Sequence, residues 1–149
     1  MAYRISKIRT KIGFERAFAL NKLIFGGFMH EGPESGNVLW LATDATGEAV
    51  GFASVRPTVD EPKAAFLSRV GVLSGHRRNG LHKRFLKVRE VYCEGKFDYI
   101  WTYTQPWNLG SANNIIRQGY LFFDPWWGEE KLLYFKKELP AHEQAQGSE

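Results

Sequence analysis

The sequence predicts an α/β (α+β) fold in which a mixed, mostly antiparallel sheet of about six to seven strands is flanked by helices. Segments with the alternation or composition of strands are interspersed with segments whose apolar residues recur at helical spacing, in the order β-α-β-β-β-α-β-α-β-β. The chain has 149 residues, of which 44% are hydrophobic and 15% aromatic, and this suffices for one packed core. We therefore expect a single domain over residues 1–140 and a flexible polar tail over residues 141–149.

The first half of the chain is predicted to form a strand, a helix and a three-strand meander. Residues 3–9 alternate like a strand, and residues 13–26 repeat apolar side chains at helical spacing before the stop signal Gly26-Gly27. Strands are expected over residues 37–44, 49–57 and 63–73. Pro57 and the turn-prone residues 58–62 predict a break between the second and the third of them.

The second half is predicted to alternate helices and strands. From Gly80 onward, apolar residues fall at positions i, i+4, i+7 and i+11, which is the pattern of one buried helix face; they are Leu81, Phe85, Val88 and Tyr92. A strand over residues 97–104, a helix over 108–118 and strands over 119–123 and 130–139 follow, and Pro140 ends the last one.

Composition excludes several classes of protein. No apolar run approaches the roughly 20 residues that span a bilayer, and the charged N-terminus does not resemble a signal peptide, so we expect a cytoplasmic protein that does not contact membranes. The one cysteine, Cys93, lies in a helical pattern and is interpreted as a packing residue. The four histidines lack metal-site spacing, so no metal is expected.

Positive charge is concentrated in one part of the chain. The net charge is +4 and the pI is near 9.2. From His76 to Glu90 the sequence contains six Arg or Lys residues and only one acidic residue, Glu90. These basic residues are Arg77, Arg78, Lys83, Arg84, Lys87 and Arg89. They surround the segment LSGHRRNGLHKRF, residues 73–85, where a strand ends in a glycine-containing turn and a helix begins.

Such a junction predicts an anion site, because free backbone N–H groups and the helix dipole converge there. It is not a Walker A loop, since Leu81 and His82 stand where that motif needs Lys and Ser or Thr. The G-x-G-x-x-G dinucleotide fingerprint is absent as well.

The junction instead resembles the motif R/Q-x-x-G-x-G/A of the GNAT superfamily of N-acetyltransferases. Arg77 and Gly80 match it, and His82 departs from it, because the family has Gly or Ala there. The resemblance implies the GNAT fold, with the loop holding the pyrophosphate of acetyl-CoA (coenzyme A) and the preceding strand end pairing with its pantetheine. It assigns cofactor contacts to Val70, Gly71, Val72, Arg77, Arg78, Asn79, Gly80, Leu81 and His82.

A second stretch, residues 107–120, resembles the family's motif N-x-x-A/S-x-x-x-Y-x-x-x-G-F. Asn108, Ser111, Gly119 and Tyr120 match it. Asn108 is suited either to cap the helix or to offer its amide to pantetheine, and Ser111 is assigned to the cofactor with it. Gly119 is expected to end the helix. Together the two motifs cover roughly residues 65 to 122.

The catalytic groups are less well defined. Many members of the family have a Tyr that protonates the departing thiolate, and this chain has Ile115 at that position. Ser111, Tyr103 and Tyr120 are the candidates to replace it. The candidates for a general base stay open and are Ser68, Arg69, Tyr103, Glu31, Glu34 and Asp60.

The resemblance implies an N-acetyltransferase that moves the acetyl group of acetyl-CoA to a primary amine by direct attack in a ternary complex. A non-catalytic acyl-CoA-binding domain is one alternative. The other is a nucleic-acid-binding module that lays Lys83, Arg84, Lys87 and Arg89 along phosphates, which no known motif in the sequence supports.

The acceptor amine is not identified by the sequence. Acidic residues in the expected loops favour a cationic acceptor; they are Glu31, Glu34, Glu129 and Glu130. The adjacent Trp126 and Trp127 suit either an acceptor site or a contact between two copies, which leaves a homodimer open.

Overall fold

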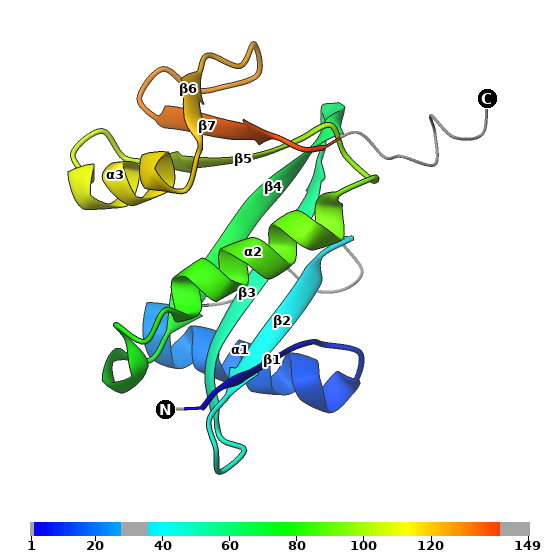
Figure 1. Ribbon diagram of the computed structural model, residues 1–149, viewed down its shortest axis with the longest axis vertical. Coiled ribbons are helices and arrows are strands. Elements are labelled where there is room, and N and C mark those ends of the chain that lie inside the picture. Colours follow the sequence, from blue (N-terminus) through cyan, green and yellow to red (C-terminus); the bar gives the residue numbers. More distant parts are fainter. Residues whose placement is uncertain (1, 28–35, 141–149) are drawn as a thin grey trace. The chain divides into compact units, whose positions relative to one another are not determined.

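The computed structural model describes residues 2–27 and 36–140, and its elements follow the predicted order (Figure 1). They are β1 (Arg4–Lys7), α1 (Lys11–Phe25), β2 (Val38–Thr43), β3 (Ala49–Thr58), β4 (Glu61–Val72), the 3-10 turn η2 (Ser74–His76), α2 (Leu81–Cys93), β5 (Tyr99–Thr104), α3 (Leu109–Arg117), β6 (Leu121–Phe123) and β7 (Leu133–Glu138). The strands form one seven-stranded sheet in the order β1-β2-β3-β4-β5-β7-β6. The predicted α/β fold with a mixed, mostly antiparallel sheet is confirmed.

The pairing of β4 with β5 is parallel, whereas β1 with β2, β2 with β3, β5 with β7 and β6 with β7 pair antiparallel. A parallel pair needs a long crossover connection, and α2 supplies it. Within the described ranges, no helix is both long and apolar enough to cross a membrane.

The chain divides into two compact units, and each is described by itself. The first comprises Met1–Arg56 and Ser68–Val91, and the second comprises Pro57–Leu67 and Tyr92–Glu149. Strand β4 contributes to both. That residues 1–140 form a single domain stays a prediction, and the expected tail, residues 141–149, lies outside the described residues.

In the first unit, α1 and α2 cover opposite faces of the sheet (Figure 1). Phe52 on β3 contacts Phe25 of α1 and packs into a cluster with Ile8, Ala17, Leu20, Leu39 and Leu41. The preceding residue, Gly51, faces the other way, so that a Cβ added there would lie 3.2 Å from Phe85 of α2. The alternation follows from the strand, in which successive side chains point to opposite faces.

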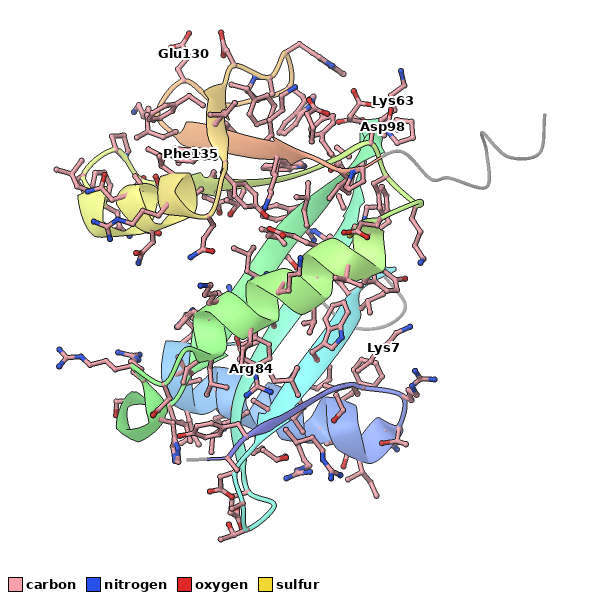
Figure 2. The ribbon with its side chains drawn as sticks, in the orientation of Figure 1. Lys7, Lys63, Arg84, Asp98, Glu130 and Phe135 are labelled. Atoms are coloured by element: carbon pink, nitrogen blue, oxygen red, sulfur yellow. The ribbon has the colours of Figure 1, made fainter. Side chains whose placement is uncertain are left out.

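The second unit is built around β5. Its pairing with β4 runs from Ala64↔Tyr99 to Phe66↔Trp101, and β7 and then β6 extend the sheet on the other side. Phe66 and Trp101 stack with ring centroids 4.3 Å apart and pack with Ala64 and Tyr134. Lys63 and Asp98, labelled in Figure 2, close the end of this pairing, because the Asp98 N–H donates to the Lys63 carbonyl at 2.7 Å.

Several predicted boundaries differ from the structure by one to three residues. β3 continues through Pro57 to Thr58, and β4 begins at Glu61 and includes Pro62, so that the turn is only Val59 and Asp60. The register of β3 with β2 ends at Val38↔Val55, so the missing N–H of Pro57 costs the sheet no hydrogen bond on that side. The last strand begins at Leu133, three residues later than expected.

Candidate functional site

The segment between β4 and α2 has the backbone geometry of an anion site. Arg78 has a φ of 66° and Gly80 a φ of 76°, both in the left-handed region. This conformation turns successive N–H groups toward one side of the loop, and it costs a non-glycine residue on the order of 1 kcal/mol or more. Apart from the two chain neighbours of Gly80, no atom of the described residues lies within 4 Å of the position that a Gly80 side chain would take. The backbone there is open to a ligand.

Side chains of the loop brace the loop itself. The Nε of Arg77 donates to the Val72 carbonyl at 3.2 Å, and the side-chain amide of Asn79 donates to the carbonyls of His76 and Arg77. Tyr3 forms a hydrogen bond of 3.0 Å with Nδ1 of His76. Arg77 and Asn79 therefore stabilise the conformation of the loop. The sequence predicted cofactor contacts for both residues and did not predict this structural role.

The first turn of α2 adds positive potential. Leu81 is buried and anchors the helix, whereas His82, Lys83 and Arg84 are exposed. Arg84, labelled in Figure 2, donates to the Tyr3 carbonyl at 3.3 Å. The N–H groups of a first helical turn have no acceptor within the helix, and the helix dipole is positive there. This end of α2 is therefore suited to the pyrophosphate that the family motif implies.

Arg89 does not belong to this exposed basic surface. Only 3% of it is exposed, and its guanidinium donates to the carbonyls of Phe85 and Ser54 inside the first unit. The alternative of a nucleic-acid interface placed Arg89 along phosphates with Lys83, Arg84 and Lys87. That placement is wrong for Arg89, because its side chain is committed to packing α2 against β3.

Residues 70–72 form the end of β4. Gly71 is glycine for a packing reason, since an added Cβ would lie 3.0 to 3.1 Å from atoms of Phe25, Ile24 and Phe52. Val72 is buried, and Val70 is half-buried. The N–H of the next residue, Leu73, donates to the Val50 carbonyl, so β3 holds this strand end in place. The predicted contact of residues 70–72 with pantetheine stays a prediction.

The second motif lies on α3 in the second unit. The Asn108 side chain accepts a hydrogen bond from the Ser111 N–H at 3.2 Å, which confirms the cap, and Gly119 ends the helix with a φ of 95°. Ser111 and Ile115 are half-buried and one turn apart, so they share one side of α3. A contact of Asn108 and Ser111 with the same cofactor as the loop of the first unit stays a prediction.

The three candidates for the general acid differ in exposure. Tyr120 is 1% exposed and belongs to the core of its unit, whereas Tyr103 on β5 is 42% exposed and stacks on Phe66 with ring centroids 5.9 Å apart. The N–H of Ser111 is engaged by the Asn108 cap. Tyr103 is therefore the more accessible of the two tyrosines.

The candidates for a general base lie in different places. The Ser68 hydroxyl is hydrogen-bonded to that of Ser54 at 2.7 Å, and Arg69 donates to Asn21 at 2.7 Å. Asp60 lies in the exposed β3–β4 turn, and Glu31 and Glu34 lie outside the described residues. Asn21, the partner of Arg69, was not predicted as a site residue; it is completely buried in the apolar stripe of α1. A polar residue in the middle of that stripe was the available signal.

The two adjacent tryptophans have different surroundings. Trp127 packs on Trp101 with ring centroids 4.4 Å apart, whereas Trp126 is exposed. Cys93 is buried, which agrees with its interpretation as a packing residue.

Although the His82 side chain is exposed by surface area, nearby protein atoms displace part of its water. This desolvation lowers the pKa of His82 below its ordinary value, and the charges of Arg89 and Arg77 lower it further. The unfolded chain therefore binds a proton at His82 more readily than the folded chain does. The resulting contribution to stability is fully present above the unfolded pKa of about 6.5 and is lost as the pH falls through the folded pKa.

We expect the wild-type protein to lose more unfolding free energy than the His82→Ala variant when the pH is lowered from about 7.5 to about 5. Urea unfolding of both proteins at a series of pH values measures the difference. The other histidines are common to both proteins, so subtraction cancels their contribution. Parallel stability curves would contradict the expectation.

Comparisons with known proteins identify the family. The model of the acetyltransferase (GNAT) family matches residues 8–120. The comparison with curated proteins gave no match.

Solved structures of low sequence identity share the fold. The ribosomal-protein-S18-alanine N-acetyltransferase from Escherichia coli has a TM-score of 0.73 at 15% identity, over 95% of this chain and 96% of that one. An acetyltransferase of the GNAT family from Staphylococcus aureus has a TM-score of 0.70 at 17% identity, over 93% and 100%. A GNAT family acetyltransferase from Elizabethkingia anophelis, solved with acetyl-CoA bound, has a TM-score of 0.69 at 15% identity, over 92% and 98%. On the match of the family model, which includes both motifs, this chain belongs to the acetyltransferase (GNAT) family.

Proposed function

We propose that the protein is an acetyl-CoA-dependent N-acetyltransferase that acts on a primary amine. The observation that carries the proposal is the loop between β4 and α2, where left-handed Arg78 and Gly80 open the backbone at the start of a helix surrounded by exposed basic residues. Membership of the family supports acetyl-CoA as the cosubstrate, and a GNAT neighbour from Elizabethkingia anophelis was solved with acetyl-CoA bound.

The reaction needs no covalent enzyme intermediate. The lone pair of a neutral amine attacks the thioester carbonyl, a C–N bond forms and the C–S bond breaks; the amine loses a proton, and the coenzyme A thiolate gains one. The part of the protein is to bind the phosphates, to orient the two reactants and to stabilise the oxyanion through backbone N–H groups. Orientation alone contributes on the order of 7 kcal/mol in favourable cases.

Ile115 favours a second candidate function, an acyl-CoA-binding domain that does not transfer the acetyl group. A thiol with a pKa of about 8.5 leaves tolerably well as the thiolate, so the absence of the family's Tyr at position 115 slows transfer but does not forbid it. Tyr103 and Ser111 remain the candidates for a replacement acid.

Two measurements on the full chain test the proposal. Isothermal titration calorimetry with acetyl-CoA measures binding, and release of free thiol in the presence of a panel of primary amines measures transfer. Binding with amine-dependent thiol release is the expected result. Binding without transfer to any amine would favour the non-catalytic domain. Salt-sensitive RNA binding without acetyl-CoA binding would overturn both.

A further inference from the structure

Arg69 on β4 is held in place by two neutral groups of α1. Its NH1 atom donates to Oδ1 of Asn21 at 2.7 Å, and its guanidinium carbon lies 4.8 Å from the centre of the Phe25 ring. Asn21 is completely buried, and its own NH2 group donates to the Gly27 carbonyl at 2.9 Å. This second bond fixes the Asn21 amide with its oxygen toward Arg69. The Asn21 amide and the Phe25 ring therefore hold the Arg69 guanidinium in a defined position.

The charge of Arg69 is not neutralised by the part of the chain that the structure describes. Arg69 is half-buried, and no ion pair links it to an Asp or Glu among residues 2–27 and 36–140. Arginines that lose much of their water are normally paired with a carboxylate, because a desolvated charge without a counter-ion is costly. A guanidinium has five N–H donors in a planar fork that matches a carboxylate, and the bond to Asn21 uses one. The remaining donors are suited to an anionic ligand.

The position of Arg69 along β4 indicates which ligand this is. Arg69 immediately precedes Val70, where the family resemblance places the pantetheine of acetyl-CoA, and consecutive Cα atoms lie about 3.8 Å apart. The neighbouring Ser68 and Ser54 hydroxyls are bonded to each other at 2.7 Å, so this stretch of the strand is polar within an otherwise apolar core. An amine that approaches the acetyl group near Val70 would bring its own substituents within reach of the Arg69 fork.

We propose that Arg69 binds the carboxylate of the acceptor, so that the acceptor is a small molecule with both a primary amine and a carboxylate, such as an amino acid. The inference rests on the proposed acetyl transfer and specifies its acceptor. It differs from the cationic acceptor that the acidic loops favour. Of the four acidic residues behind that expectation, Glu129 and Glu130 belong to the other unit, and Glu31 and Glu34 lie outside the described residues. Among the described residues, the positive Arg69 immediately precedes the predicted pantetheine contact at Val70.

The test compares each standard amino acid with its own α-carboxamide as acceptor, by measuring thiol release from acetyl-CoA. The carboxamide's amine loses its proton more readily, so without a contact to the carboxylate the carboxamide would be the better nucleophile. We expect the wild-type protein to prefer at least one acid over its carboxamide in kcat/KM. This preference for the acid would be opposite to the order expected from the reactivity of the two amines alone.

Three variants connect this preference to Arg69. Arg69→Gln is expected to lower kcat/KM for the preferred acid by about 10- to 100-fold, mainly through KM, because a charged hydrogen bond is lost. Activity toward the carboxamide and the affinity for acetyl-CoA should change little. Arg69→Lys, which keeps the charge and loses the fork, should give an intermediate loss. Arg4→Gln removes an equal charge from the exposed face of β1 in the same unit and should behave like wild type.

The possible outcomes distinguish failure of the proposed acceptor from failure of the proposed acetyl transfer. Equal use of acid and carboxamide by the wild-type protein, or an equal loss on both in Arg69→Gln, would overturn the role of Arg69 and leave the proposed acetyl transfer intact. A purely structural role of Arg69 would lower both activities together and reduce thermal stability. Acetyl-CoA binding without transfer to any amine would overturn the proposed reaction, and with it this inference.

Discussion

Gly80→Glu is expected to weaken acetyl-CoA binding by at least about 100-fold, which corresponds to about 2.8 kcal/mol. Gly80 adopts a φ of 76° with open space where its side chain would be. A glutamate would place a carboxylate at the position proposed for the pyrophosphate, where it would repel the ligand, and it would strain the left-handed backbone. Isothermal titration calorimetry of both proteins measures the effect.

Gly47 offers a matched control for this variant. It also has a positive φ, of 88°, and nothing lies within 4 Å of an added Cβ, but it belongs to the β2–β3 turn. Gly47→Glu therefore introduces a comparable backbone strain and the same charge outside the candidate site, and it should bind acetyl-CoA like wild type. Unchanged affinity in Gly80→Glu would refute the site, and an equal loss in Gly47→Glu would show that the loss is a general effect of stability.

Ile115→Tyr is expected to raise kcat for acetyl transfer, by up to about 100-fold if departure of the thiolate limits the rate. General acid catalysis typically contributes that much or more. The resemblance places the family's Tyr at this position, and the structure places Ile115 one helical turn after Ser111 on the same side of α3. Steady-state thiol release with a fixed amine measures kcat.

Ile115→Phe is the control, since it adds the ring without the hydroxyl. We expect Ile115→Phe to stay near the wild-type rate, and the gain of Ile115→Tyr to disappear as the pH rises toward the ordinary tyrosine pKa of about 10. Equal rates for the two variants would contradict a role for a proton donor at this position. A wild-type protein without activity that becomes active as Ile115→Tyr would favour the non-catalytic acyl-CoA-binding function.

The features that can be predicted from the sequence depend on interactions over a few residues. The Gly119 stop of α3 is confirmed, and so is the cap, one of the two roles predicted for Asn108, because capping and left-handed turns are decided by the backbone within one helical turn. The strand-to-helix junction at residues 73–85 was recognised for the same reason. The start of β4 was predicted two residues too late, after Pro62, because whether a proline is tolerated depends on the partner of its strand.

The sequence by itself determined the order of the elements and the motifs of the acetyltransferase (GNAT) family, and it predicted an anion site at the junction, since these depend on periodicity and on local backbone preferences. Only the tertiary structure decided which basic side chains are exposed and which are buried against other parts of the chain. Arg84 and Arg89 lie on the same helix, and one is exposed while the other is buried against β3. Arg69 is likewise positioned by Asn21, a residue 48 positions away in the chain. Burial and partner are set by contacts between distant segments, and these form only when the chain is folded.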